Sequence, residues 1–279
     1  MKTVIRALAL GAAFALSAAQ ASAQGQPLRV GVDGTFAPHA FPNLSGGVQG
    51  FNIDLIEEIG KKLGRKVEIT AAQFSGLIPA LQAGSLDLIG APVTLTAERA
   101  QNLLFSEGYL NTDYQFIVKK GAPPIKALDD LKGKVISVNK GSVYDSWARG
   151  LADKIGWTVE SFGTQTDAAQ AVMAGRAYAN VAGNTVTAWA AKNNPQIEAT
   201  FIHKTGLVFS FAMRKDQTAF RAEMENALEC LKLDGTVARI HEKWLGAKPE
   251  AGSAAVTVFP GTGAPGYDGH DAAPREPKC

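Results

Sequence analysis

The sequence lacks most of what common enzyme and nucleic-acid-binding classes require. It has four histidines and two cysteines in 279 residues. The motifs of serine hydrolases, zinc peptidases and P-loop proteins are absent from it. Basic and acidic residues number 28 and 26, and no basic stripe occurs. We therefore expect no catalytic residues, no metal or other cofactor, and no nucleic-acid partner.

Long apolar runs are confined to the N terminus. Lys2 and Arg6 precede an apolar run over Ala7–Ala19, and Ala21-Ser22-Ala23 matches a signal-peptidase site. Residues 1–23 are therefore predicted to be a secretory signal peptide, cleaved after Ala23. The run is too short to span a bilayer well, and no later segment reaches about 18 apolar residues. We expect a mature protein that is exported to the periplasm.

Export bears on the two cysteines, because disulfides persist in oxidising compartments. Cys230 lies in a helical pattern and Cys279 is the last residue. A disulfide between them would attach the end of the chain to that helix; the alternative is a buried Cys230 and a free terminal thiol. Residues 247–279 are rich in Gly, Pro and Ala and are predicted to form an extended tail.

Between the predicted signal peptide and the tail, apolar strands alternate with amphipathic helices. Strands are predicted at Leu28–Val32, Lys66–Ala71 and Leu86–Ile89, with helices at Gly50–Leu63 and from Phe74 to Gly84. Gly90-Ala91-Pro92 is expected to end the third strand, and a return strand is predicted at Val208–Met213. This alternation is typical of an α/β fold with a mostly parallel sheet.

Two stretches have the features of an anion site. Arg99 stands in the first turn of a helix that Thr96 should cap, where a cation opposes the helix dipole. An arginine beside free helix N–H groups suits a carboxylate or phosphate. The alternative is a surface arginine paired with Glu98 or Glu107. In the second half, Ser142 should cap another helix that begins at a strand end.

Asp33 is a third candidate, because it follows the first strand. Open α/β sheets bind ligands at the carboxyl ends of their strands. The alternative is that Asp33 caps a helix or turn. Phe36 would stand beside it as an apolar wall.

Five motifs occur in one order: D-x-x-x-A-P from Asp33, GFNIDLIEEIGKKLG from Gly50, LIPALQAGSLDLI from Leu77, T-x-T-x-E-R from Thr94, and FSEGYL from Phe105. From about Leu28 to Gly246 the chain resembles the periplasmic solute-binding proteins of polar amino-acid ABC transporters. The resemblance implies a monomer with the type II periplasmic binding fold. Its two lobes, each a mostly parallel sheet flanked by helices, would capture a small carboxylated solute for an ABC permease and its ATPase.

The resemblance also implies boundaries. Lobe 1 takes residues 24–115 and 209–246, and lobe 2 takes residues 116–208. Two hinge crossings are expected near Gln115–Lys119 and Leu207–Phe211.

The resemblance assigns roles by position. Arg99 would bind the ligand carboxylate with the N–H groups of Thr94 and Val143. An α-ammonium would contact the carbonyl of Ala91 or Pro92 and the Thr94 hydroxyl. The remaining positions form the walls of the site, with Asp33 facing the side-chain end. The full set of expected ligand-binding residues is Asp33, Phe36, Phe74, Ala91, Pro92, Thr94, Arg99, Asn139, Ser142, Val143, Tyr144 and Asn184.

The sequence departs from the family pattern at three of these positions. Asn184 replaces an aspartate that pairs with the α-ammonium, Pro92 lacks an N–H, and Val143 lacks a hydroxyl. The carboxylate site is intact, whereas the ammonium site has lost its main counter-charge unless Asp33 replaces it. We therefore expect a carboxylated ligand that need not be a standard α-amino acid.

Two other classes remain open. Periplasmic cyclohexadienyl dehydratases look similar in the first lobe, and their catalytic glutamate lies in the loop that corresponds to Ser142–Asp145. Asp145 is the one acid there, and helix capping explains it more simply. An accessory or sensor protein could also use this fold.

Overall fold

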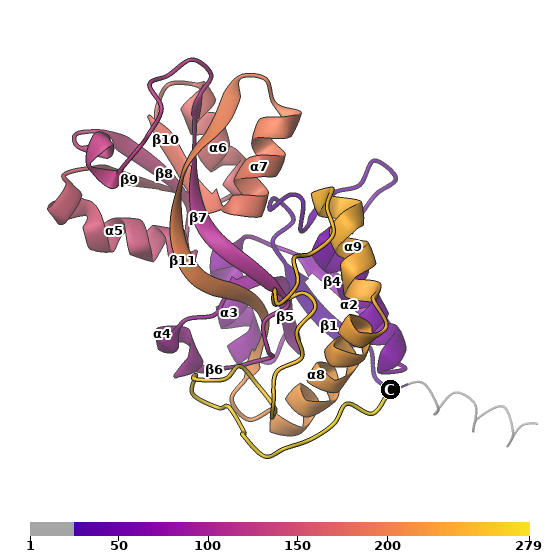
Figure 1. Ribbon diagram of the computed structural model, residues 1–279. Coiled ribbons are helices and arrows are strands. Elements are labelled where there is room, and N and C mark those ends of the chain that lie inside the picture. Colours follow the sequence, from indigo (N-terminus) through magenta and orange to yellow (C-terminus); the bar gives the residue numbers. More distant parts are fainter. Residues whose placement is uncertain (1–24) are drawn as a thin grey trace, which may run out of the picture.

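The computed structural model describes residues 25–279, so the predicted signal peptide lies outside the described residues. The described part forms two lobes, which two long strands connect (Figure 1). Its helices are all too short or too polar to cross a membrane.

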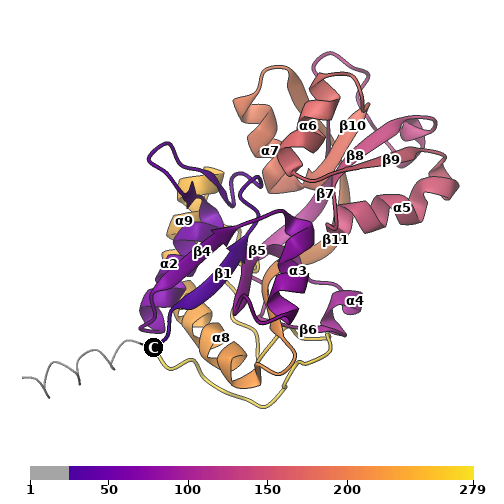
Figure 2. The ribbon, with the colours of Figure 1, turned by 180° about the vertical axis from the view of Figure 1, so that it is seen from behind.

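Lobe 1 is a parallel sheet with helices on both faces. Helix α2 places its apolar stripe against the sheet together with α8, while α3 covers the other face, as Figure 2 shows from behind. A short hairpin, β2–β3, precedes α2. The elements of this lobe are β1 (Leu28–Val32), β2 (Phe41–Pro42), β3 (Val48–Gln49), α2 (Phe51–Lys62), β4 (Val67–Ala71), α3 (Phe74–Gln82), β5 (Leu88–Thr94), α4 (Ala97–Ala100), β6 (Leu103–Phe105), α8 (Thr218–Leu233) and α9 (Thr236–Leu245).

Lobe 2 repeats this plan on a smaller scale. Strand β8 pairs in parallel with β9 and β10, and its apolar residues are buried under the flanking helices. The elements of this lobe are η1 (Leu128–Leu131), β8 (Val135–Asn139), α5 (Val143–Ile155), β9 (Thr158–Phe162), α6 (Gln165–Met173), β10 (Ala179–Gly183) and α7 (Asn184–Asn193).

Two antiparallel strands, β7 (Leu110–Lys119) and β11 (Ile197–Arg214), run through both lobes. They join the two parallel sheets into one, in the order β4-β1-β5-β11-β7-β10-β8-β9, with β6 beside β11. In lobe 1, Phe209 of β11 pairs with Thr94, and in lobe 2, Tyr114 of β7 pairs with Gly183. On β7, Leu110 therefore pairs at the lobe 1 end, opposite Phe209, and Tyr114 pairs at the lobe 2 end.

Strand β11 is longer than the sequence indicates. The prediction covered Val208–Met213, whereas the strand begins at Ile197. Its first half is only partly buried, so it lacks the apolar run that identified the second half.

The prediction that strand β5 ends before Gly90 is wrong, since the strand continues to Thr94. The pairing of β5 with β11 shifts register between Ser210 and Ala212, opposite Pro92. A proline lacks the N–H that a ladder requires, and an irregularity of this kind accommodates it inside a sheet.

The C-terminal segment after α9 lies along lobe 1, past β6 and α8 (Figure 1). Cys279 forms a disulfide with Cys230 of α8. The backbone of the segment is also held along its length: Ala254 N–H donates to Asn111, and the Gly269 carbonyl accepts from Arg221.

Candidate functional site

A cavity lies between the lobes, and its walls contain eleven of the twelve residues predicted from sequence. The cavity volume is about 10 Å³, which is room for about one water molecule, so the walls stand close together. The lining residues are Asp33, Phe36, Phe74, Ala91, Pro92, Thr94, Arg99, Asn139, Ser142, Val143 and Tyr144.

The fold explains this convergence. The cavity lies beyond the carboxyl ends of β1, β5 and β8, where parallel strands bring their loops together. Asp33 directly follows β1 and Asn139 is the last residue of β8. Helices that begin at the same edge supply Phe74 and Tyr144.

Arg99 is held in place by neutral groups among the described residues. Its backbone N–H donates to Oγ1 of the N-cap Thr96, as predicted. Its Nη1 donates to the Thr94 carbonyl at 3.1 Å and its Nη2 to the Gly141 carbonyl of lobe 2 at 3.4 Å. The guanidinium carbon lies 5.6 Å from the centre of the Phe74 ring. Arg99 therefore has two neutral acceptors and an aromatic face.

Within residues 25–279, no carboxylate lies within ion-pairing distance of Arg99. The alternative of a pair with Glu98 or Glu107 is wrong, because Glu107 pairs with Lys232 instead. Burial lowers the pKa of the Arg99 guanidinium, although arginine stays charged at neutral pH. An uncompensated charge in such a place is costly, and an anionic ligand would offset this cost.

Asp33 is buried and links the two lobes. Its Oδ1 accepts hydrogen bonds from the Thr35 N–H at 3.0 Å and the Thr35 hydroxyl at 2.6 Å. Its Oδ2 accepts from Nδ2 of Asn139 in lobe 2 at 2.8 Å. Thr35 in turn accepts from the Gln165 N–H of lobe 2 at 3.2 Å. Sequence reasoning missed both residues, because Thr35 stands at an unspecified position of the D-x-x-x-A-P motif and Gln165 belongs to no motif.

Two lining residues carry buried polar atoms without a hydrogen-bond partner: Oδ1 of Asn139 and the hydroxyl of Tyr144. The Tyr144 ring meets the Tyr114 ring edge to face at 5.0 Å. Burial raises the pKa of Tyr144 above its usual value, so the hydroxyl remains a donor at neutral pH. Unpartnered buried polar atoms are rare in folded proteins, and these two are candidates for ligand contacts.

Asn184 is the one predicted site residue that the cavity does not include. Its Oδ1 accepts from the Asp113 N–H at 3.1 Å, and it lines a separate groove with Trp189 and Trp244. Asn184 is the first residue of α7, and its side chain is held against the connecting strand β7.

Ser142 caps α5 as the sequence predicts, and Asp145, the third residue of that helix, takes part in the cap. Its N–H donates to Oγ of Ser142 at 3.2 Å, and its Oδ2 accepts from the Gly141 N–H. Its Oδ1 accepts from Arg149 at 2.8 Å and from Ser161 at 2.7 Å. Both carboxylate oxygens are therefore occupied by the protein itself.

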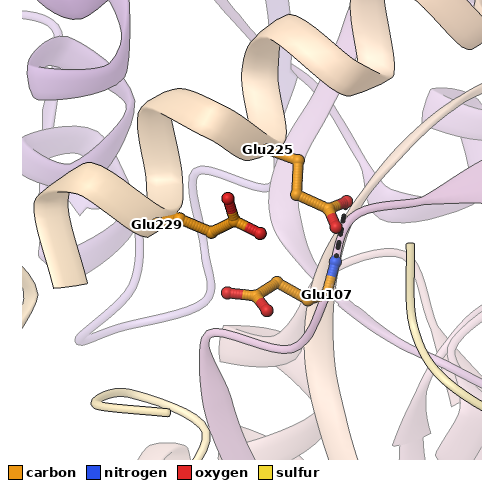
Figure 3. A group of neighbouring side chains, drawn as sticks. All are labelled: Glu107, Glu225 and Glu229. Carbon is orange, nitrogen blue, oxygen red and sulfur yellow. Dashed lines mark hydrogen bonds between the residues drawn. The ribbon is translucent and has the colours of Figure 1, made fainter. Parts of the chain in front are cut away.

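Outside the cleft, the described residues bring three buried glutamates together (Figure 3). Glu225 and Glu229 extend from α8 toward Glu107, which follows β6. This carboxylate cluster has partners from the chain: Lys232 Nζ lies 2.5 Å from Glu107, and Arg275 Nη2 lies 2.5 Å from Glu229. The two cations make it a poor site for a metal ion.

A two-lobed α/β fold with a polar cavity between the lobes, and an unpaired arginine in that cavity, defines a solute-binding protein of the periplasmic type. Residues 28–247 match the model of the bacterial extracellular solute-binding proteins, family 3. The chain belongs to this family, which confirms the resemblance seen in the sequence.

Two relatives illustrate the match. PatH of Vibrio harveyi, named as an amino-acid ABC transporter-binding protein, is 32% identical over 251 residues, which cover 85% of this chain and 95% of PatH. The lysine/arginine/ornithine-binding periplasmic protein of Escherichia coli strain K12 is 29% identical over 261 residues, which cover 88% of this chain and 97% of that protein.

Solved structures confirm the type II fold. An ancestral arginine-binding protein bound to arginine has a TM-score of 0.75 at 38% identity, covering 80% of this chain and 99% of that chain. An ancestral amino acid-binding protein, described as a precursor of cyclohexadienyl dehydratase, has a TM-score of 0.73 at 32% identity, covering 79% of this chain and 96% of that chain.

Proposed function

We propose that this protein is the substrate-binding component of an ABC importer and that it captures an amino acid or a related carboxylated solute between its lobes. The observation that carries the proposal is Arg99, a cation in the cavity wall with no carboxylate partner among residues 25–279. A guanidinium binds a carboxylate through two parallel hydrogen bonds. The solute carboxylate would be the missing partner.

The other lining residues fit around that contact. The protonated Tyr144 hydroxyl is a second donor for the solute carboxylate, and the N–H groups of Thr94 and Val143 are further donors. Phe36 and Phe74 form apolar walls for the solute side chain. In this proposal Ala91, Pro92 and the Thr94 hydroxyl provide acceptors for an amine, while Ser142 caps α5 and holds its first turn at the cavity. Asn184 has no part in the proposed site.

Capture requires the lobes to separate and close. Hydrogen bonds between the lobes support a closed arrangement. Among them are Asn139 to Asp33, Arg99 to Gly141, Gln165 to Thr35, and His39 to Thr185 at 2.8 Å. We place the hinge on β7 between Leu110 and Tyr114 and on β11 where its register shifts between His203 and Leu207. With this hinge, β7 from Tyr114 onward belongs to lobe 2, so the proposed boundary lies ahead of the division between residues 24–115 and 116–208 that the sequence predicts. Residues 209–246 complete lobe 1, and residues 247–279 form a tail on it.

The location and partners follow from the same proposal. Cleavage after Ala23 would release the mature chain into the periplasm as a monomer. An ABC permease and its ATPase in the inner membrane would then take up the solute and supply the energy. The relatives named for amino-acid transport support this assignment.

We propose no catalysis. A cyclohexadienyl dehydratase would need a free acid in the Ser142–Asp145 loop, and both oxygens of Asp145 are engaged by Gly141, Arg149 and Ser161. Turnover of prephenate by the purified protein would overturn this part of the proposal.

The proposal is tested by ligand binding to the mature chain. Amino acids, opines and simple carboxylates would be screened by thermal shift and then by calorimetry. A ligand at about 100 times its Kd adds about 2.7 kcal/mol, which raises the melting temperature by several degrees. Arg99→Ala should weaken binding at least about 100-fold, whereas the exposed Arg239→Ala should leave Kd unchanged. Absence of binding by every carboxylate would contradict the proposal and favour an accessory role.

A further inference from the structure

The orientation of the Asn139 amide is fixed by its neighbour. An ionised carboxylate only accepts hydrogen bonds, so the group that Asn139 directs at Oδ2 of Asp33, 2.8 Å away, must be its NH₂. The amide oxygen must then lie on the opposite side of the side chain. Asn139 is fully buried at the last position of β8, so its backbone is held by the sheet.

That amide oxygen is an acceptor without a donor. Oδ1 of Asn139 is one of eight buried side-chain polar atoms in residues 25–279 that have no hydrogen-bond partner. The residue lines the cavity, beside the one acidic side chain in the lining, Asp33. A buried, unpaired acceptor on a side chain that lines a ligand cavity calls for a donor on the ligand.

We propose that Oδ1 of Asn139 accepts a hydrogen bond from an ammonium group of the ligand, and that Asp33 is the positioning residue that holds the amide in this orientation. The inference rests on the proposed function, because it assumes a carboxylated ligand bound at Arg99. Asp33 contributes in a second way, since its negative charge lies behind the amide and favours a cationic donor over a neutral one. The ligand is then a small amine-bearing carboxylate. Its ammonium is bound by Asn139 of lobe 2 and not by Asn184.

A buried asparagine elsewhere in lobe 2 provides a matched control. Asn180 is also fully buried, but its Oδ1 accepts from Gln165 at 2.8 Å and its Nδ2 donates to the Ser137 carbonyl at 2.8 Å. It does not line the cavity. Replacement of Asn180 should therefore affect stability without affecting the choice of ligand.

The test compares ligands in matched pairs. Calorimetry would measure Kd for each standard amino acid that binds and for the same carboxylate with hydrogen in place of the ammonium. The wild-type protein should prefer the amine-bearing member at least about tenfold. In Asn139→Leu this ratio should fall to near one, because the acceptor is lost for the amine-bearing member alone, whereas loss of the contact with Asp33 between the lobes affects both members alike. Asn180→Leu should keep the wild-type ratio.

Asp33→Asn tests the positioning role without changing the shape of the cavity. An amide at residue 33 can donate or accept, so Asn139 is free to turn its NH₂ toward the ligand. The preference for the amine-bearing member should fall at least about fivefold. A wild-type ratio near one, or a ratio that survives both Asn139→Leu and Asp33→Asn, would overturn the inference. In that case, loss of binding in Arg99→Ala would still support the proposed function. The experiment therefore distinguishes failure of the inference about Asn139 from failure of the proposed function.

Discussion

The cleft and the carboxylate cluster both bury charged side chains, but they differ in where the partners come from. In the cluster, Lys232 donates to Glu107, to the Gly108 carbonyl and to the Thr257 carbonyl, so all three hydrogens of its ammonium have acceptors. In the cleft, the acceptors of Arg99 are two backbone carbonyls, and no described carboxylate pairs with it. A charge that the chain pairs internally belongs to the fold, whereas a partly buried charge with no partner among the described residues is available to a ligand.

The C-terminal segment supplies hydrogen-bond donors and a cation to the three glutamates of the carboxylate cluster. Its backbone donates to two of the carboxylates: Phe259 N–H to Glu107 at 2.8 Å and Gly263 N–H to Glu225 at 2.6 Å. Its Arg275 pairs with Glu229. The segment lies beyond the family match, which ends at residue 247, so this chain adds its own cover to the cluster.

The largest effect should come from breaking the buried pair. Lys232→Met leaves the Glu107 carboxylate buried without its cation, and we expect a loss of about 3–5 kcal/mol in the free energy of unfolding. Urea unfolding measures it. The exposed pair Lys120–Glu198 is the control, because Lys120→Met should cost less than about 1 kcal/mol. Equal effects at the two lysines would contradict a structural role for the buried pair of Lys232 and Glu107.

A smaller effect should appear in the pH dependence of stability. Burial, aided by the charges of Glu107 and Glu229 and opposed by the Gly263 N–H and Arg221, raises the pKa of Glu225 from 4.5 to about 7. The folded state therefore binds more protons than the unfolded state between pH 4.5 and about 7. Stability should fall as pH rises through this window, by up to about 3 kcal/mol from this group.

Glu225→Gln isolates that contribution. The glutamine keeps an acceptor for the Gly263 N–H but does not titrate, so the fall in stability between pH 4.5 and 7 should be smaller than in the wild type. Urea unfolding at several pH values checks the difference. Identical pH profiles would mean that Glu225 has the same pKa in both states.

The contrast between the regions also separates what the sequence could predict from what it could not. Arg99 was predictable, because a cation in a helix's first turn breaks a local rule. Asp33 was predictable from its place at a strand end. Both signals are local, so one stretch of chain is enough to reveal them.

The cluster has no local signal. Glu225 and Glu229 resemble the exposed face of an amphipathic helix, and only the returning tail, which appeared featureless, buries them. The contact between Asn139 and Asp33 joins residues of different lobes, and it too depends on the tertiary fold. The position of Asn184 could not be predicted either, because motif alignment fixes the residue but not the direction of its side chain.

The smallest change in stability should come from Arg99→Met. This variant also compares Arg99 in the cleft directly with Lys232 in the carboxylate cluster. Methionine keeps a flexible chain over the Phe74 ring and removes the unpaired charge with its hydrogen bonds to Thr94 and Gly141. The two effects oppose each other, so without ligand the free energy of unfolding should change by less than about 1 kcal/mol, against the 3–5 kcal/mol expected at Lys232. A saturating carboxylated ligand should separate the two proteins. The free energy of unfolding of the wild type should rise by about 2.7 kcal/mol at 100 times Kd, and that of the variant should hardly change. A loss of several kcal/mol in the ligand-free variant would show instead that Arg99 is a structural cation like Lys232, and the cleft would then have no charge to offer a solute.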